Sequence, residues 1–151
     1  MPQKKQTQPD STLTTLLDRQ AIREVLTAYF SHANALRFDA VAACFAPDAV
    51  GTYRGDKRIG VKAIVDKVSG LKTRKSSMHV MGTHSATLEG NTATTETVVF
   101  EYLRADDGSG KDFDMISCLR YNDKLTKTEG GWLIQERVVT PHWGRLEAVT
   151  K

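Results

Sequence analysis

The sequence predicts an α+β fold in which a curved, cone-like antiparallel sheet wraps around one long N-terminal helix, with two shorter helices beside it. Two observations support this prediction. Residues 76–143 contain four runs rich in β-branched and aromatic residues, which are typical of strands. Before them, apolar residues recur at the spacing of amphipathic helices. Because helices that precede an antiparallel sheet must cover one of its faces, we expect a pocket between the two layers.

Three turn signals separate the four strand-like runs. Gly90-Asn91 supplies the positive φ that a tight hairpin needs, and glycine-rich stretches follow at residues 106–110 and 129–131. The four runs therefore predict a meander of antiparallel strands.

The long helix is predicted from a cap and an apolar stripe. Thr15 and Asp18 have the spacing of a capping box, and apolar residues continue from there to Phe30 at intervals of three and four. Leu16 and Leu17 are counted in this stripe. Asn34 lies four residues after Phe30, so its side chain continues the stripe if the helix persists that far.

The segment between the long helix and the meander predicts three short elements. Asp39 can cap a short helix that ends at Pro47. A brief strand, AVGTYR, follows at residues 49–54. A third helix covers residues 61–68 and stops at Gly70.

Length and composition favour one cytoplasmic domain. We expect a disordered tail at residues 1–10 and a single domain at residues 11–151. The N-terminus has no apolar signal region, and no run is long enough to span a membrane. Cys44 and Cys118 lie in apolar runs, which predicts buried free thiols rather than a disulfide or a metal site.

The charge pattern argues against a nucleic-acid partner. The formal net charge is only +3, and the basic clusters at residues 4–5 and 72–75 are not interleaved with aromatic residues. We interpret both clusters as solvated charge.

Several stretches of the chain resemble one known family. They are AIREVLTAYFSHANALRFDAVAACFAPDAV, GVKAIV, MHVMGTHSATLEGNTAT and LRYNDKLTKTEGGWLIQER. These look like the SnoaL-like branch of the nuclear-transport-factor-2-like superfamily, whose enzymes include scytalone dehydratase, polyketide cyclases and bile-acid dehydratase. The resemblance implies a conical domain with a deep apolar pocket, a homodimer or homotrimer, and no metal or organic cofactor. It also implies elimination or proton transfer at carbon.

The resemblance points to three catalytic positions. Dehydratases of the family place a Tyr and, five residues later, an Asp on the first helix, and a His on the first strand of the meander. The matching residues are Tyr29, Asn34 and His79. Asn34 departs from the pattern because an amide cannot ionise, although it can accept a hydrogen bond from an imidazole N–H or cap the end of its own helix. His79 is the best single general acid and base, since imidazole titrates near neutrality.

The neighbour of His79 across the hairpin depends on strand register. Counting back from a two-residue turn at Gly90-Asn91 puts His79 opposite Tyr102, and we favour this pairing. A slip of one residue puts it opposite Glu101 instead, which would restore the missing carboxylate from another strand. His84 lies five residues from His79 and would face away from it in an unbulged strand.

The expected substrate-binding residues are Phe100, Glu101, Tyr102 and Arg137. Phe100 suits an apolar wall, and Arg137 on the last strand could anchor a phenol, carboxylate or hydroxyl group.

These features together predict a cofactor-independent lyase or isomerase. Its substrate would be a small hydroxylated apolar ring compound, such as an aromatic, polyketide or steroid-like molecule. One alternative is a ligand-binding or assembly module without catalysis, which the Asn34 substitution favours. Another is an accessory subunit of a ring-hydroxylating dioxygenase.

Overall fold

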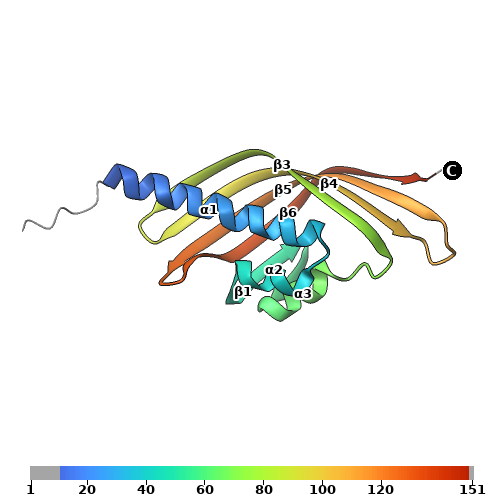
Figure 1. The fold of residues 1–151 in the computed structure, drawn as a ribbon, viewed down its shortest axis with the longest axis horizontal. Coiled ribbons are helices and arrows are strands. Elements are labelled where there is room, and N and C mark those ends of the chain that lie inside the picture. Colours follow the sequence, from blue (N-terminus) through green and yellow to red (C-terminus); the bar gives the residue numbers. More distant parts are fainter. Residues whose placement is uncertain (1–10, 150–151) are drawn as a thin grey trace, which may run out of the picture.

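The computed structural model describes residues 11–149 and contains three helical segments that cover one face of a six-stranded sheet (Figure 1). The helical segments are α1 (Ser11–Asn34), α2 (Phe38–Val41) with the short 3₁₀ helix η1 (Ala42–Cys44), and α3 (Val61–Val68). The strands are β1 (Phe45–Tyr53), β2 (Asp56–Ile59), β3 (Arg74–Glu89), β4 (Thr92–Asp106), β5 (Asp112–Thr128) and β6 (Gly131–Ala148).

The α+β class and the meander are confirmed. The sheet is curved and not closed, its order is β2-β1-β6-β5-β4-β3, and β3 to β6 pair antiparallel in sequence. The hairpin between β3 and β4 turns at Gly90, whose φ is 61°, with Glu89 paired to Thr92 as predicted.

The sheet extends beyond the predicted meander. β1 begins at Phe45, before Pro47, and pairs parallel with β6. Proline is tolerated there because the register shifts between Phe45 and Val50, at an irregularity where ladder bonds are not required. β2 was not predicted as a strand, because its sequence DKRI has the charged character of an exposed edge strand rather than an apolar alternation.

Helix α1 buries one stripe against the sheet, but the stripe begins later than predicted. Its fully packed residues are Ile22, Leu26, Tyr29, Phe30 and Ala33. Leu16 and Leu17 are 59% and 61% exposed. The first turns of α1 reach beyond the ends of the strands (Figure 1), and Leu16 lies beside Ser85 and Ala86 of β3 without being buried.

A buried ion pair joins β5 and β6 beneath α1. The Arg137 guanidinium donates to both carboxylate oxygens of Asp123, at 2.7 and 2.8 Å, and both side chains are fully buried. Three aromatic rings pack around the same guanidinium, at 4.1 Å for Tyr29, 4.8 Å for Tyr121 and 5.4 Å for Phe45. This cluster therefore links α1, β1, β5 and β6.

Strand β3 contains a bulge that changes its register. Met81 pairs with Val99 and His84 with Thr97, so Gly82 and Thr83 together face Val98. A Cβ at Gly82 would lie 3.3 Å from the Val98 carbonyl oxygen, so glycine suits this close approach.

Cys44 and Cys118 are buried free thiols, as predicted. The predicted tail at residues 1–10 lies outside the described residues. No helix within residues 11–149 is long and apolar enough to cross a membrane.

We expect Asp123→Asn to lower the free energy of unfolding by about 3–5 kcal/mol, because it leaves the Arg137 cation buried without its counterion. Chemical denaturation measures this loss. Lys124→Gln is the control, since it removes a solvent-exposed ion pair with Glu136 and should cost less than about 1 kcal/mol. Equal losses in the two variants would show that the buried pair has no special role.

Candidate active site

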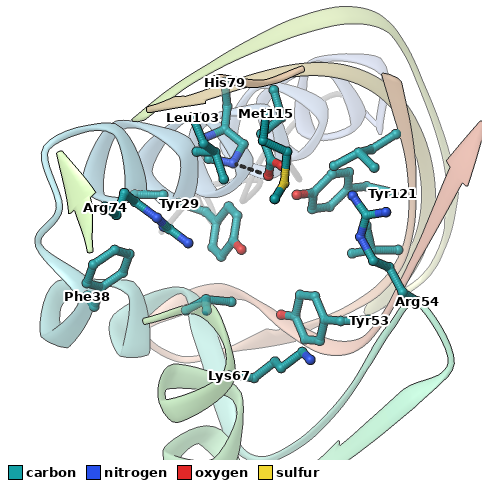
Figure 2. A pocket seen from close by; sticks show the side chains of 15 residues that line it. Tyr29, Phe38, Tyr53, Arg54, Lys67, Arg74, His79, Leu103, Met115 and Tyr121 are labelled. Carbon is teal, nitrogen blue, oxygen red and sulfur yellow. Dashed lines mark hydrogen bonds and ion pairs between the residues drawn. The ribbon is translucent and has the colours of Figure 1, made fainter. Parts of the chain in front are cut away.

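A cavity of about 200 Å³ opens between the helices and the sheet (Figure 2). Its walls come from the end of α1, from α2 and α3, and from β1, β3, β4, β5 and β6. The polar and charged residues that line it are Tyr29, Tyr53, Arg54, Lys67, Arg74, His79, Glu101 and Tyr121. Most of the remaining lining is apolar, so the cavity suits an apolar molecule with a few polar groups.

Asn34 holds His79 by three hydrogen bonds, one of which runs from its Nδ2 to the His79 carbonyl oxygen at 3.4 Å. Its Oδ1 lies 2.7 Å from the backbone nitrogen of His79 and 2.8 Å from the ring Nδ1. The backbone N–H can only donate, so the amide atom facing it must be the oxygen. That oxygen cannot donate in return, and Nδ1 must therefore carry a proton. Asn34 fixes the tautomer and orientation of the imidazole, and its side chain is not used to cap its own helix.

The other ring nitrogen of His79 faces a carboxylate. Nε2 lies 3.1 Å from Oε2 of Glu101, and the two side chains are only 6% and 13% exposed. The ring of Phe30 stacks on the imidazole at 5.5 Å between centroids. Since Nδ1 already carries a proton, two unprotonated atoms would repel each other at this distance. A hydrogen bond between His79 and Glu101 therefore requires one further proton, on Nε2 or on Oε2.

The β3 bulge selects Glu101 as this partner. The turn at Gly90 forms as predicted, but the extra residue at Gly82-Thr83 shifts the pairing by one, so His79 lies opposite Glu101. The favoured pairing with Tyr102 is therefore wrong. The same bulge brings His84 onto the face that His79 occupies, where its Nδ1 contacts Thr97 Oγ1 at 2.9 Å, outside the cavity lining.

Three tyrosine hydroxyls point into the cavity (Figure 2). Burial raises the pKa of Tyr29 above its ordinary value of 10.0, and raises the pKa of Tyr53 and Tyr121 well above it. All three are consequently neutral hydrogen-bond donors at physiological pH. The hydroxyl of Tyr53 is buried and has no hydrogen-bond partner among the described residues.

The structure separates the sequence-predicted site residues into two groups. Tyr29, His79 and Glu101 line the cavity, with Asn34 directly behind the histidine. The other three do not line it, and their positions are corrections. Phe100 and Tyr102 flank Glu101 in strand β4, so side-chain alternation turns them to the opposite face, where Tyr102 is 47% exposed and Phe100 packs on Trp143. The Arg137 guanidinium packs against the ring of Tyr29, outside the cavity lining, and already forms an ion pair with Asp123.

Five polar or charged cavity residues were not predicted as site residues: Tyr53, Arg54, Lys67, Arg74 and Tyr121. Tyr53 and Arg54 enter through the parallel pairing of β1 with β6, which no local pattern indicated. Tyr121 could have been predicted, because it lies two residues after the apolar Leu119 on β5, and alternate residues of a strand face the same side. Arg74 was assigned to a solvated basic cluster but begins β3 and lines the cavity.

No cluster of three or more His, Cys, Asp and Glu side chains within the described part of the chain is placed to hold a metal ion.

The chain belongs to the SnoaL-like family. Residues 14–138 match the family's domain model, which confirms the resemblance seen in the sequence and agrees with the wider nuclear-transport-factor-2-like superfamily. An uncharacterized protein of Mycobacterium tuberculosis is 29% identical over 135 residues, which cover 85% of this chain and 88% of the relative.

Solved structures share the fold at lower identity. A candidate scytalone dehydratase of Novosphingobium aromaticivorans is 20% identical, covers 93% of each chain and has a TM-score of 0.81. The hexachlorocyclohexane dehydrochlorinase LinA-type3 of Novosphingobium barchaimii is 14% identical, with a TM-score of 0.78 over 93% of this chain and 95% of its own.

We expect Asn34→Leu to release the His79 imidazole from its single tautomer, because the Oδ1 acceptor is lost. Histidine ¹⁵N NMR in the wild type should show Nδ1 protonated from pH 5 to pH 8, the range in which imidazole ordinarily titrates, at about 6.5. The variant should show both tautomers at neutral pH. The signals of His84, which bonds Thr97 instead, serve as the control. Unchanged Nδ1 protonation in Asn34→Leu would contradict this role of the amide.

The raised tyrosine pKa values also predict the response to alkali. Three of the four tyrosines should remain protonated in the folded protein above pH 10, as followed by phenolate absorbance. A raised folded-state pKa contributes stability that is present below the unfolded value of about 10 and is lost as pH rises through the folded value. Tyr53→Phe should therefore make the alkaline loss of stability shallower. Ionisation of all four tyrosines near pH 10 with the fold intact would refute the raised pKa values.

Proposed function

We propose that this protein is a cofactor-independent lyase or isomerase that acts on a small hydroxylated ring compound. The observation that carries the proposal is the 3.1 Å contact between His79 Nε2 and Glu101 Oε2 at the wall of a cavity with three neutral phenols. Such a pair can both accept and supply a proton without any other group.

An elimination balances within this pair. Glu101 takes a proton from a ring carbon, and the electron pair of that C–H bond forms the new double bond. The bond to the hydroxyl group on the neighbouring carbon then breaks, and His79 Nε2 gives its proton to the leaving oxygen, which departs as water. The proton on Glu101 then returns to Nε2, so the starting state is restored. In an isomerisation, the proton goes back to a different carbon of the ring.

The tyrosines would stabilise charge on the substrate. Hydroxyl groups of Tyr29, Tyr53 and Tyr121 point into the cavity and stay protonated, so they can donate to an oxygen that becomes negative as the proton leaves carbon (Figure 2). The Tyr53 hydroxyl is buried and meets no geometric hydrogen-bond criterion within the described residues, so a substrate oxygen could accept from it.

The size of the cavity favours a single ring. At about 200 Å³ it lies between a cavity of roughly 150 Å³, which holds one benzene, and the roughly 300–1,000 Å³ of sites for drug-sized ligands. We therefore favour a monocyclic substrate over a steroid-like or polyketide molecule.

Two further points support an enzyme over a pure binding module. The Asn34 substitution favoured a module without catalysis because it removes a carboxylate, but Glu101 supplies one within 3.1 Å of the imidazole. The fold also resembles proteins named as a candidate scytalone dehydratase and a dehydrochlorinase, and both names denote elimination reactions.

To test the proposal, we would incubate the protein in D₂O with a panel of cyclic β-hydroxyketones and cyclic enones. Deuterium exchange at ring carbons and release of water would be followed by NMR and mass spectrometry. His79→Ala and Glu101→Gln should each lower the rate by at least about 100-fold, the usual scale for a general acid or base. His84→Ala is the control, since His84 lies outside the cavity lining. No exchange or elimination above the buffer rate, or wild-type rates in His79→Ala, would refute the proposal.

A further inference from the structure

We propose that the ring compound bound in this cavity carries a carboxylate group, which Arg74 binds while Arg54 attracts it from the opposite wall. This inference names the substrate class for the site described above and so rests on the proposed function.

The charges around the cavity do not cancel. Three cationic side chains line it, Arg54, Lys67 and Arg74, against the single carboxylate of Glu101, which is paired with His79. Lys67 lies 2.9 Å from Asp56, a carboxylate that it shares with Arg58. Within residues 11–149, no carboxylate lies within 4.0 Å of either arginine. Two guanidinium groups therefore line the cavity without a salt bridge, and Glu101 acts on Arg74 only from a longer distance.

Arg74 has the geometry of an anion anchor. Its guanidinium stacks over the ring of Phe38, at 5.2 Å from the centroid, and is directed toward the cavity beside Tyr29 (Figure 2). Its Nε is buried and has no hydrogen-bond partner among the described residues. Burial lowers the pKa of Arg74, so the folded protein holds this cation at a cost that a bound anion would offset.

Arg54 occupies a backbone position that does not suit it. It has a φ of 53° and is followed by Gly55 at 85°, in the tight turn between β1 and β2. Turns of this type favour Asn-Gly, since a bulky side chain with positive φ is strained. The side chain donates from Nη2 to Ser117 Oγ at 3.3 Å, which holds the guanidinium beside the cavity. The Arg54 cation therefore lies at the cavity although its backbone conformation is strained.

A carboxylate is the anion that best fits these features. The planar guanidinium matches a carboxylate by two parallel hydrogen bonds, and stacking on Phe38 fixes the plane of the Arg74 fork. In a cavity with room for one ring, a carboxylate at Arg74 would leave the rest of the ring near Glu101 and the tyrosine hydroxyls (Figure 2). The substrate class is therefore a hydroxylated monocyclic carboxylate.

The test measures binding and needs no turnover. The probes are 4-hydroxybenzoate and 4-hydroxybenzamide, which have nearly the same shape but differ in charge. Isothermal titration calorimetry should show that the wild type binds the carboxylate at least about tenfold more tightly than the amide, as expected for charge-assisted hydrogen bonds.

Arg74→Gln should abolish this preference, and Arg54→Gln should reduce it. Arg145→Gln is the matched control, because it removes the same net charge from an exposed position on β6 that pairs with Glu147 and does not line the cavity. It should keep the full preference. Circular dichroism would confirm that each variant is folded, and Arg54→Gln keeps the test open if Arg74→Gln does not fold.

Equal binding of the two probes, no binding of either at millimolar concentration, or a full preference in both Arg74→Gln and Arg54→Gln would overturn the inference. Separate measurements of binding and of proton transfer in the wild type distinguish this inference from the proposed function. Charge-selective binding without any proton-transfer activity would refute the proposed function alone. Activity on uncharged rings with no charge preference would refute this inference alone.

Discussion

The buried guanidinium of Arg137 is the constraint on which the cavity depends. Asp123 neutralises it, and the rings of Tyr29, Tyr121 and Phe45 pack around it from three different elements. A fully buried cation has to keep all of these partners, because leaving it unpaired would be costly. Two of those rings carry hydroxyls that point into the cavity, so the ion pair fixes the phenols that face the substrate.

A second constraint acts through backbone register. One extra residue at Gly82-Thr83 decides which side chain of β4 faces His79, and it decides for Glu101 over Tyr102. On the remaining side, Asn34 reaches from α1 to hold the same imidazole. The imidazole of His79 is thus positioned by α1 and β4, two elements that are distant in the sequence and come together only in the folded protein.

Much of the fold followed from local pattern, and less of the site did. The meander was predictable because its turn residues and β-branched runs are local signals, and Tyr29, Asn34 and His79 were found from the family resemblance. The bulge was not predictable, because a glycine within a strand permits a bulge without requiring one. Tyr53 and Arg54 were missed because they depend on the pairing of β1 with β6, which are separated by most of the chain. Arg137 was predicted to bind the substrate. The structure pairs it with Asp123 in the core, which the sequence alone did not show.

The position of Asn34 has a consequence for how such a site can change over time. An aspartate on the helix would both orient the histidine and carry the negative charge beside it, so one substitution would remove both properties. Here orientation belongs to Asn34 and charge to Glu101, on elements 67 positions apart in the numbering. Each property can therefore vary without loss of the other, and a survey of relatives that inspects only the helix position would misjudge which of them retain a functional pair.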